Sequence, residues 1–110
     1  MQKIEASKSF ADIPIAATDK VEIEKSLLIN PGEYWIGRAV LKSAQEGEEA
    51  FNYYKNKMPD YDWVSVTSVQ SKVSILTFEK SDRFAAVQIE SVGMRGSAIT
   101  ITVTPRESSI

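Results

Sequence analysis

Residues 73–91 read VSILTFEKSDRFAAVQIES, two stretches of alternating apolar and polar residues that are joined by Ser81-Asp82. Alternation of this kind, rich in β-branched and aromatic residues, is typical of strands with one buried face. A two-residue connection between two such stretches favours an antiparallel hairpin. The sequence therefore predicts a fold based on an antiparallel sheet.

Two further stretches, residues 63–69 and 98–104, have the same strand character, and short connections at 70–72 and 92–97 link them to the hairpin. The residues predicted to face inward are Leu76, Phe78, Val87, Ile89, Ile99, Ile101 and Val103. The residues predicted to face outward are Thr77, Glu79, Gln88, Glu90, Thr100 and Thr102. One dry face and one wet face indicate an antiparallel sheet that is covered on a single side.

The N-terminal half predicts a second hairpin. Residues 21–29 alternate as a half-buried strand, with a break in the pattern at Lys25. Residues 30–33 (NPGE) form a turn, and residues 34–42 form the returning strand. The phase of this returning strand is mixed. Either both of its faces are partly covered, or a bulge occurs near Gly37.

One long helix is expected between the two sets of strands. Ser43-Ala44-Gln45-Glu46 matches a capping box, and Pro59 ends the helix after Met58. The stripe with helical spacing consists of Gly47, Ala50, Phe51, Tyr54 and Met58. The predicted fold is therefore α+β, in the order β-β-α-β-β-β-β, with one helix packed on one face of an antiparallel sheet.

The chain has 110 residues, a length that suits one domain. Residues 1–18 show no sustained periodicity and are expected to be a flexible N-terminal tether, with Ile13-Pro14-Ile15 as a short edge segment. Residues 19–105 are expected to form the single α+β domain, and residues 106–110 a C-terminal tail.

Composition excludes several classes of function. The net charge is −2, from 13 basic and 15 acidic residues without a basic block, which argues against nucleic-acid binding. The chain has no cysteine and no histidine. Disulfides, thiolate metal sites and thiol catalysis are therefore excluded, and the commonest general base is missing.

The carboxylates have structural explanations. Glu46, Glu48 and Glu49 lie where negative charge complements a helix dipole, and Asp60 and Asp62 are typical turn residues. Calcium-loop, phosphate-loop and activated-serine motifs are absent from the sequence. We therefore expect no enzyme, no cofactor and no metal site, and the sequence leaves the binding residues unidentified.

The aromatic residues near the helix and its flanking strands are Tyr34, Trp35, Tyr53, Tyr54, Tyr61 and Trp63. Tyr54 belongs to the helical stripe, whereas Tyr53 is rotated from it by about 100°. Packing in the core explains such a set, because large aromatic side chains dominate small cores. An exposed patch that binds a protein or peptide is the alternative, since Trp and Tyr are enriched at interfaces.

Residues 51–59 (FNYYKNKMP), followed by Trp63, resemble a pattern of small, uncharacterised bacterial envelope lipoproteins, in which an aromatic-rich helix ending in Met-Pro precedes Gly-Trp. Residues 76–80, 86–89 and 99–105 are similar to strands of the same mature domains, so the resemblance covers about residues 20–105. Asp62 stands where that family usually has glycine, and no cysteine for lipidation is present. The resemblance implies an exported domain in the periplasm or cell envelope. It also implies a tether to the membrane through a flexible N-terminal segment, the anchoring part of which is a removed N-terminal segment. A cytoplasmic location is the alternative.

Three functions follow in order of preference. The first is a non-enzymatic, envelope-associated domain that binds or scaffolds another protein. The second is a small-ligand or lipid-binding module with a pocket between the helix and the sheet. The third is an enzyme that acts through carboxylates such as Asp60 and Asp62. The sequence leaves the oligomeric state open, although exposed edge strands could pair in a dimer.

Overall fold

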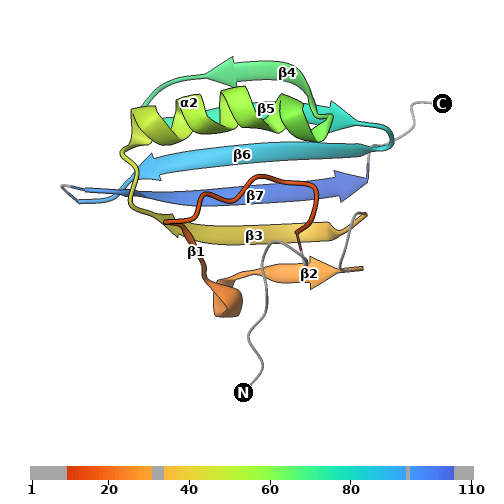
Figure 1. Cartoon of the computed structure of the whole chain (residues 1–110), viewed down its shortest axis with the longest axis horizontal. Coiled ribbons are helices and arrows are strands. Elements are labelled where there is room, and N and C mark those ends of the chain that lie inside the picture. Colours follow the sequence, from red (N-terminus) through yellow and green to blue (C-terminus); the bar gives the residue numbers. More distant parts are fainter. Residues whose placement is uncertain (1–9, 31–33, 94, 106–110) are drawn as a thin grey trace.

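The structure is a computed structural model in which residues 10–30, 34–93 and 95–105 are described. The elements are β1 (Lys20–Val21), η1 (Ile23–Lys25), β2 (Leu27–Ile29), β3 (Ile36–Ser43), α2 (Gly47–Lys57), η2 (Met58–Tyr61), β4 (Val64–Val69), β5 (Val73–Lys80), β6 (Arg83–Ser91) and β7 (Ser97–Pro105), where η marks a 3-10 helix. Within the described residues, one α-helix lies against a seven-stranded antiparallel sheet, which confirms the predicted α+β fold (Figure 1).

The sheet has the strand order β1-β3-β7-β6-β5-β4, and β2 also pairs with β3. The four C-terminal strands form the predicted meander, and the N-terminal hairpin joins it through β3 and β7. β4 therefore lies at one edge of the sheet. The other edge consists of the two short strands β1 and β2.

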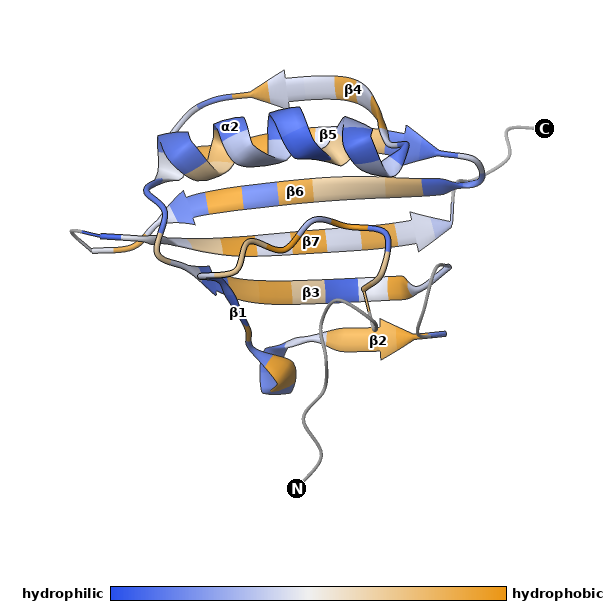
Figure 2. Ribbon diagram, in the orientation of Figure 1, coloured by the Kyte–Doolittle hydropathy of each residue, from blue (hydrophilic) through white to orange (hydrophobic). Residues whose placement is uncertain are grey.

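One face of the sheet carries the core. In Figure 1, α2 lies over β5 and β6, and residues 10–19 cross β7 and β3 on the same side of the sheet. The residues predicted to face inward from β5, β6 and β7 are all buried, as are Ala50, Phe51, Tyr54 and Met58 of the helical stripe. Figure 2 shows the corresponding mixture along the ribbons, with apolar and polar residues alternating in the long strands.

Residues 10–18 differ from the flexible tether expected for residues 1–18. The Phe10 and Ile13 side chains are each only 3% exposed, and Pro14 is also buried. The Phe10 ring meets the Trp35 ring edge-on, with 4.7 Å between centroids. No edge strand forms at Ile13–Ile15, because this segment packs on the face of the sheet. Residues 1–9 and the expected tail at 106–110 lie outside the described residues.

The single strand expected over residues 21–29 is wrong in its middle. Val21 pairs with Leu41 and Leu27 pairs with Arg38, so the chain between them has more residues than its partner strand and must loop out as η1. Ser26 holds this excursion in place. Its hydroxyl donates to the Glu22 carbonyl at 2.8 Å and accepts from the Val40 N–H at 3.0 Å.

The predicted start of the helix is also wrong. Ser43 is the last residue of β3, and the capping box is formed one turn later by Glu46 and Glu49. The Ser43 hydroxyl instead donates to the buried Asp19 carboxylate at 2.7 Å. α2 ends at Lys57, and the chain continues through Pro59 as a 3-10 helix, which accepts proline in its first turn.

The mixed phase of residues 34–42 arises because one face of β3 is buried at Ala39, Leu41 and Ser43, while the other face carries the half-buried Ile36 and Val40. β3 pairs with β7 without interruption from Gly37 to Ser43, so no bulge occurs against β7. Gly37 is required for a different reason: its φ is 140°, and a Cβ atom there would lie 2.0 Å from the Leu27 carbonyl oxygen. The bulge that does occur lies between Ser65 and Thr67 in β4.

Candidate functional site

A buried charged cluster joins the N-terminal segment to the sheet. The Asp12 carboxylate accepts hydrogen bonds from Arg83 and from Trp35 Nε1, the latter at 2.7 Å. Arg83 Nη1 also donates to the Trp35 carbonyl at 3.1 Å, and Trp63 Nε1 donates to the Asp12 carbonyl at 2.7 Å. The cluster therefore fixes two tryptophans, one arginine and one carboxylate relative to each other.

Arg83 is 5% exposed and Asp12 is 7% exposed, so both charges are largely removed from water. Burial of an unpaired charge is costly, and each ion here compensates the other. The guanidinium carbon of Arg83 lies 5.2 Å from the Trp63 ring centroid and 5.7 Å from that of Tyr34. The buried cluster thus forms a rigid base beneath the surface on which Tyr34 lies.

A pocket of about 400 Å³ opens above this cluster. We call it the tyrosine–aspartate pocket; its lining residues are Ala11, Asp12, Tyr34, Asp60, Tyr61, Asp62 and Lys80. Tyr34 is 66% exposed and Tyr61 is 38% exposed. They come from two different parts of the chain: Tyr34 precedes β3, and Tyr61 ends η2.

Lys80 closes one side of the tyrosine–aspartate pocket. Its ammonium group donates to the Tyr61 carbonyl at 2.8 Å and to Asp12 at 3.4 Å, and it lies 5.2 Å from the Trp63 ring centroid. Asp60 and Asp62 are exposed and form no ion pair with any part of the chain that the structure describes. Two carboxylates are thus free to meet a ligand, while the lysine is already engaged.

The chemistry of this pocket suits a positively charged side chain, either the planar guanidinium group of arginine or the ammonium group of lysine. Aromatic faces attract cations within about 6 Å of the ring centroid, and carboxylates form strong hydrogen bonds with guanidinium and ammonium groups. Tyr34 already lies near one cation, since the guanidinium carbon of the buried Arg83 is 5.7 Å from its ring centroid.

The structure divides the aromatic residues that the sequence singled out. Trp35, Tyr54 and Trp63 are buried, Tyr53 is half-buried against Tyr54, and Tyr34 and Tyr61 are exposed at the pocket. Glu46 and Glu49 cap α2, and Glu48 lies in its first turn. No group of three or more acidic side chains in the described ranges is arranged to hold a metal ion.

Asp12, Lys80 and Arg83 are the site residues that sequence reasoning missed. Asp12 lies 68 residues from Lys80 and 71 from Arg83, so no local spacing connects them. The available signal was Arg83 itself, a charged residue in phase with the inward-facing positions of its strand.

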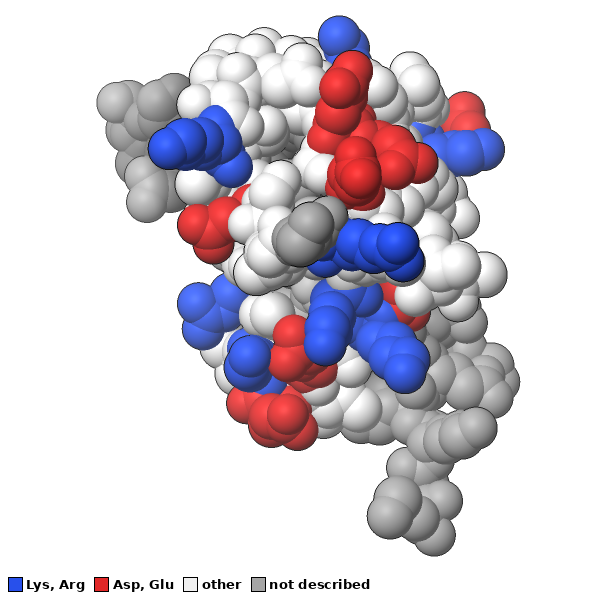
Figure 3. Space-filling model, turned by 90° about the vertical axis from the view of Figure 1, so that its left-hand side faces the viewer, with Lys and Arg blue, Asp and Glu red and all other residues white. Residues whose placement is uncertain are grey.

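A second pocket, of about 480 Å³, lies at the opposite end of β3 and is lined by Thr18, Lys20, Lys42, Ser43, Ala44, Arg95 and Gly96. We call it the cationic pocket. Figure 3 looks onto this end of the molecule and shows basic side chains gathered near its middle. Lys20 and Lys42 are direct cross-strand neighbours, an arrangement that is destabilising for like charges.

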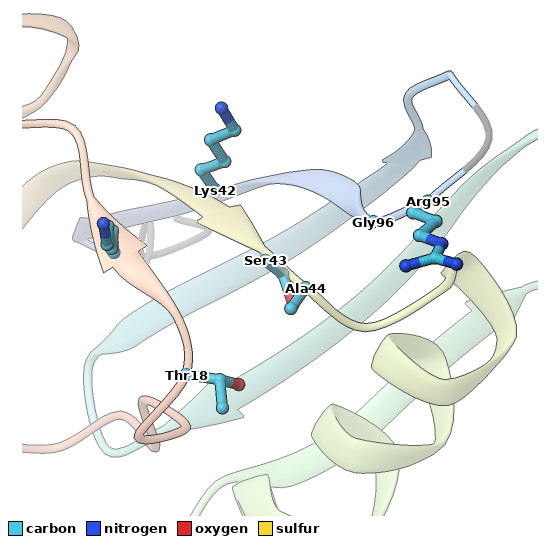
Figure 4. A pocket seen from close by; sticks show the side chains of 7 residues that line it. Thr18, Lys42, Ser43, Ala44, Arg95 and Gly96 are labelled. Carbon is cyan, nitrogen blue, oxygen red and sulfur yellow. The ribbon is translucent and has the colours of Figure 1, made fainter.

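The basic side chains of the cationic pocket do not converge on one point. In Figure 4, Lys42 extends away from Ser43 and Ala44, whereas Arg95 bends towards the turn that follows β3. Gly96 allows the β6–β7 hairpin to approach β3, because a Cβ atom there would lie 2.5 Å from the Ser43 carbonyl oxygen. This pocket therefore has a basic rim that attracts anions but does not hold an anion at one fixed point.

Two tyrosines of α2 have perturbed acidities. Burial raises the pKa of Tyr54, and the nearby Asp19 carboxylate and Tyr53 raise it further. Burial also raises the pKa of Tyr53, with smaller contributions from Tyr61 and Asp19. Both hydroxyls are therefore protonated at neutral pH, so neither supplies a phenolate.

No protein-family model, curated protein or solved structure matches this chain. Among the helices in the described ranges, none combines the length and apolar character that crossing a membrane requires.

Proposed function

We propose that this protein is a non-enzymatic binding domain that recognises another protein by holding one of its Arg or Lys side chains in the tyrosine–aspartate pocket. The observation that carries the proposal is that exposed Tyr34 and Tyr61 line one pocket together with Asp60 and Asp62, two carboxylates that form no ion pair within the described residues. Tyrosines that are exposed and already fixed in position lose little freedom on binding, which is why they are frequent at the centres of interfaces.

Rigidity supports this function. The Asp12–Arg83 pair, the two tryptophan N–H bonds and Lys80 hold the base of the pocket before any partner arrives. A preorganised surface binds more tightly than one that must be ordered on binding. An envelope location accords with the resemblance to lipoprotein domains, and fractionation of cells that express the natural reading frame tests it.

Binding to a defined probe tests the proposal. We expect the peptide Ac-Gly-Arg-Gly-NH2 to bind weakly, in the millimolar range, in a titration followed by isothermal calorimetry. The matched peptide with citrulline in place of arginine keeps the shape and loses the charge. It should bind at least about fivefold more weakly, since charge-assisted hydrogen bonds contribute about 1–3 kcal/mol.

Variants at the rim connect the binding to the pocket. The double substitution Asp60→Asn with Asp62→Asn should abolish the preference for the arginine peptide over the citrulline peptide. Tyr34→Ala should lower the affinity for both peptides. Glu48→Gln is the matched control, because it removes one exposed carboxylate of α2 that does not line this pocket. Equal binding of the two peptides to the unaltered protein would contradict the proposal.

The second candidate is binding of a small anionic ligand at the cationic pocket, favoured by the opposed Lys20 and Lys42 and by Arg95. A pocket between the helix and the sheet has less support, because Phe51, Tyr54 and Phe78 are among the side chains buried there. Inorganic phosphate is a suitable probe. This candidate predicts a binding isotherm that Lys42→Gln weakens and that added salt suppresses.

A further inference from the structure

β4 is a long edge strand with little protection. All six of its residues, Val64–Val69, are exposed, and none of them is charged or a proline. Natural proteins usually protect an edge with lysine, proline, a bulge or a covering element, because its free N–H and C=O groups can pair with another strand. Of these devices β4 has only the bulge near Val66.

The opposite edge of the sheet differs from β4. It consists of β1, with two residues, and β2, with three, separated by η1. Short, interrupted strands offer few pairing groups. The capacity for adding a strand is therefore concentrated at β4.

The sequence of β4, VSVTSV, has the symmetry needed to pair with itself. In an antiparallel pair centred between Val66 and Thr67, Val64 lies opposite Val69 of the second copy. Ser65 then lies opposite Ser68, and Val66 opposite Thr67. Valines meet valines and serines meet serines, and a β-branched residue meets another at the centre, a combination that suits cross-strand contact.

The faces of the strand also agree with this register. Val64 pairs with Glu79 and Val69 with Ile75, both on the open face, whereas Ser65 pairs with Phe78 and Ser68 with Leu76 on the helix-covered side. Val64 and Val69 therefore point to one side of the joined sheet and Ser65 and Ser68 to the other, as a continuous sheet requires, while Val66 is the bulged residue at the axis and has no partner in β5.

We infer that β4 pairs antiparallel with β4 of a second copy of this chain, in the register that places Ser65 opposite Ser68. The joined sheet brings the exposed valines of the two edges together across the axis. Pairing along six residues buries less surface than the roughly 1,600 Å² of a standard interface, so the dimer is expected to be weak.

Sedimentation equilibrium of the full chain tests the pairing. We expect reversible dimerisation within a measured range of about 0.01–1 mM protein, because interfaces below about 1,200 Å² belong to weak, transient complexes. Val66→Lys should shift the population to monomer. Val92→Lys is the matched control, because Val92 is 46% exposed and Val66 is 48% exposed, but Val92 lies in the β6–β7 connection. A protein that remains monomeric up to 1 mM would overturn the inference.

A charge-exchange experiment tests the register. The variant Ser65→Lys with Ser68→Lys, and the variant Ser65→Glu with Ser68→Glu, should each be monomeric because like charges face each other across the axis. An equimolar mixture should form a heterodimer, which native mass spectrometry resolves by mass. Failure of the mixture to associate would overturn this register.

Hydrogen exchange on the unaltered protein is independent of whether the variants fold. The amides of β4 should become more protected as protein concentration rises, while those of β2 should not change. Protection of β4 that is the same at low and high concentration would overturn the pairing.

Discussion

Tyr54 lies in the core with a hydroxyl group for which the described residues supply no hydrogen-bond partner. A buried hydroxyl without a partner costs about 1–3 kcal/mol of folding free energy. Asp19, whose charge raises the pKa of Tyr54, also has one buried oxygen without a partner among the described residues. Among the described residues, Gln45 is the other one with a buried side-chain oxygen that lacks a partner.

Tyr54→Phe should therefore leave the free energy of unfolding unchanged or raise it by up to about 1 kcal/mol at pH 8. The effect should grow in alkali. The pKa of Tyr54 is raised on folding, so the unfolded chain loses the Tyr54 proton above about pH 10 while the folded chain keeps it. Stability that depends on the protonated hydroxyl is complete below that pH and declines as pH rises.

Urea unfolding at pH 8 and pH 10.5 measures this difference. The difference in the free energy of unfolding between Tyr54→Phe and the unaltered protein should shift in favour of the variant at the higher pH. A variant that is less stable by more than about 1.5 kcal/mol at pH 8 would mean that the hydroxyl has a hydrogen-bond partner in solution.

Asp12 is the residue on which the candidate site depends. Asp12→Ala leaves the Arg83 guanidinium buried without its counter-ion, and removal of one partner from a buried pair costs about 3–5 kcal/mol. We expect a loss of that size in the free energy of unfolding. Asp60→Ala, at an exposed residue, should change it by less than about 0.5 kcal/mol. Similar small effects for both substitutions would mean that the buried cluster is not formed.

Among the elements, the long strands could be predicted from the sequence because their period-two pattern has one physical cause, a single dry face. β5, β6 and β7 match their predicted ranges within one residue. The segment at 21–29 could not be predicted. Its alternation is broken only at Lys25 and resumes at Leu27 in the same phase, whereas the Ser26 hydroxyl bonds that redirect the chain depend on β3.

The helix start shows a different limit. Ser43 and Glu46 have the spacing of a capping box, and Glu46 and Glu49 have it too. Which of the two boxes forms depends on Asp19, 24 residues before Ser43. Its carboxylate accepts the hydrogen bond of the Ser43 hydroxyl, so Ser43 does not cap the helix. The candidate site could not be predicted for the same reason: Asp12 contacts Lys80 and Arg83 across 68 and 71 residues, and no local pattern indicates such contacts.

The capping box makes an element-scale prediction. Glu46→Ala should lower the free energy of unfolding by about 1 kcal/mol, because the side-chain acceptor at the helix start is removed. Glu48→Ala is the matched control, since Glu48 shares the first turn without a capping bond. Chemical denaturation of both variants measures the difference. If Glu48→Ala costs as much as Glu46→Ala, the helix does not begin at Gly47.

For the whole molecule, the N-terminal segment is part of the folded domain. Residues 10–19 cover β3 and β7 where α2 does not reach, so the core is closed by two pieces of chain far apart in sequence (Figure 1). The sequence gives little sign of this, because an irregular segment has no periodicity to detect.

Phe10→Ala should destabilise the protein by about 3 kcal/mol, the usual cost of removing a large buried aromatic side chain. A flexible tether would show no change. Ala17→Ser, at an exposed position of the same segment, serves as the control and should have little effect. Thermal unfolding followed by circular dichroism measures both variants. Unchanged stability of Phe10→Ala would contradict the packed segment.

The most direct test of the central claim is residue-resolved NMR of the amide groups during titration with Ac-Gly-Arg-Gly-NH2. Our account predicts that shifts concentrate at Tyr34, Asp60, Tyr61, Asp62 and Lys80, around the tyrosine–aspartate pocket, and that the citrulline peptide leaves these amides nearly unmoved. Shifts that instead cluster at Lys20, Lys42 and Arg95, or that are identical for the two peptides, would contradict it.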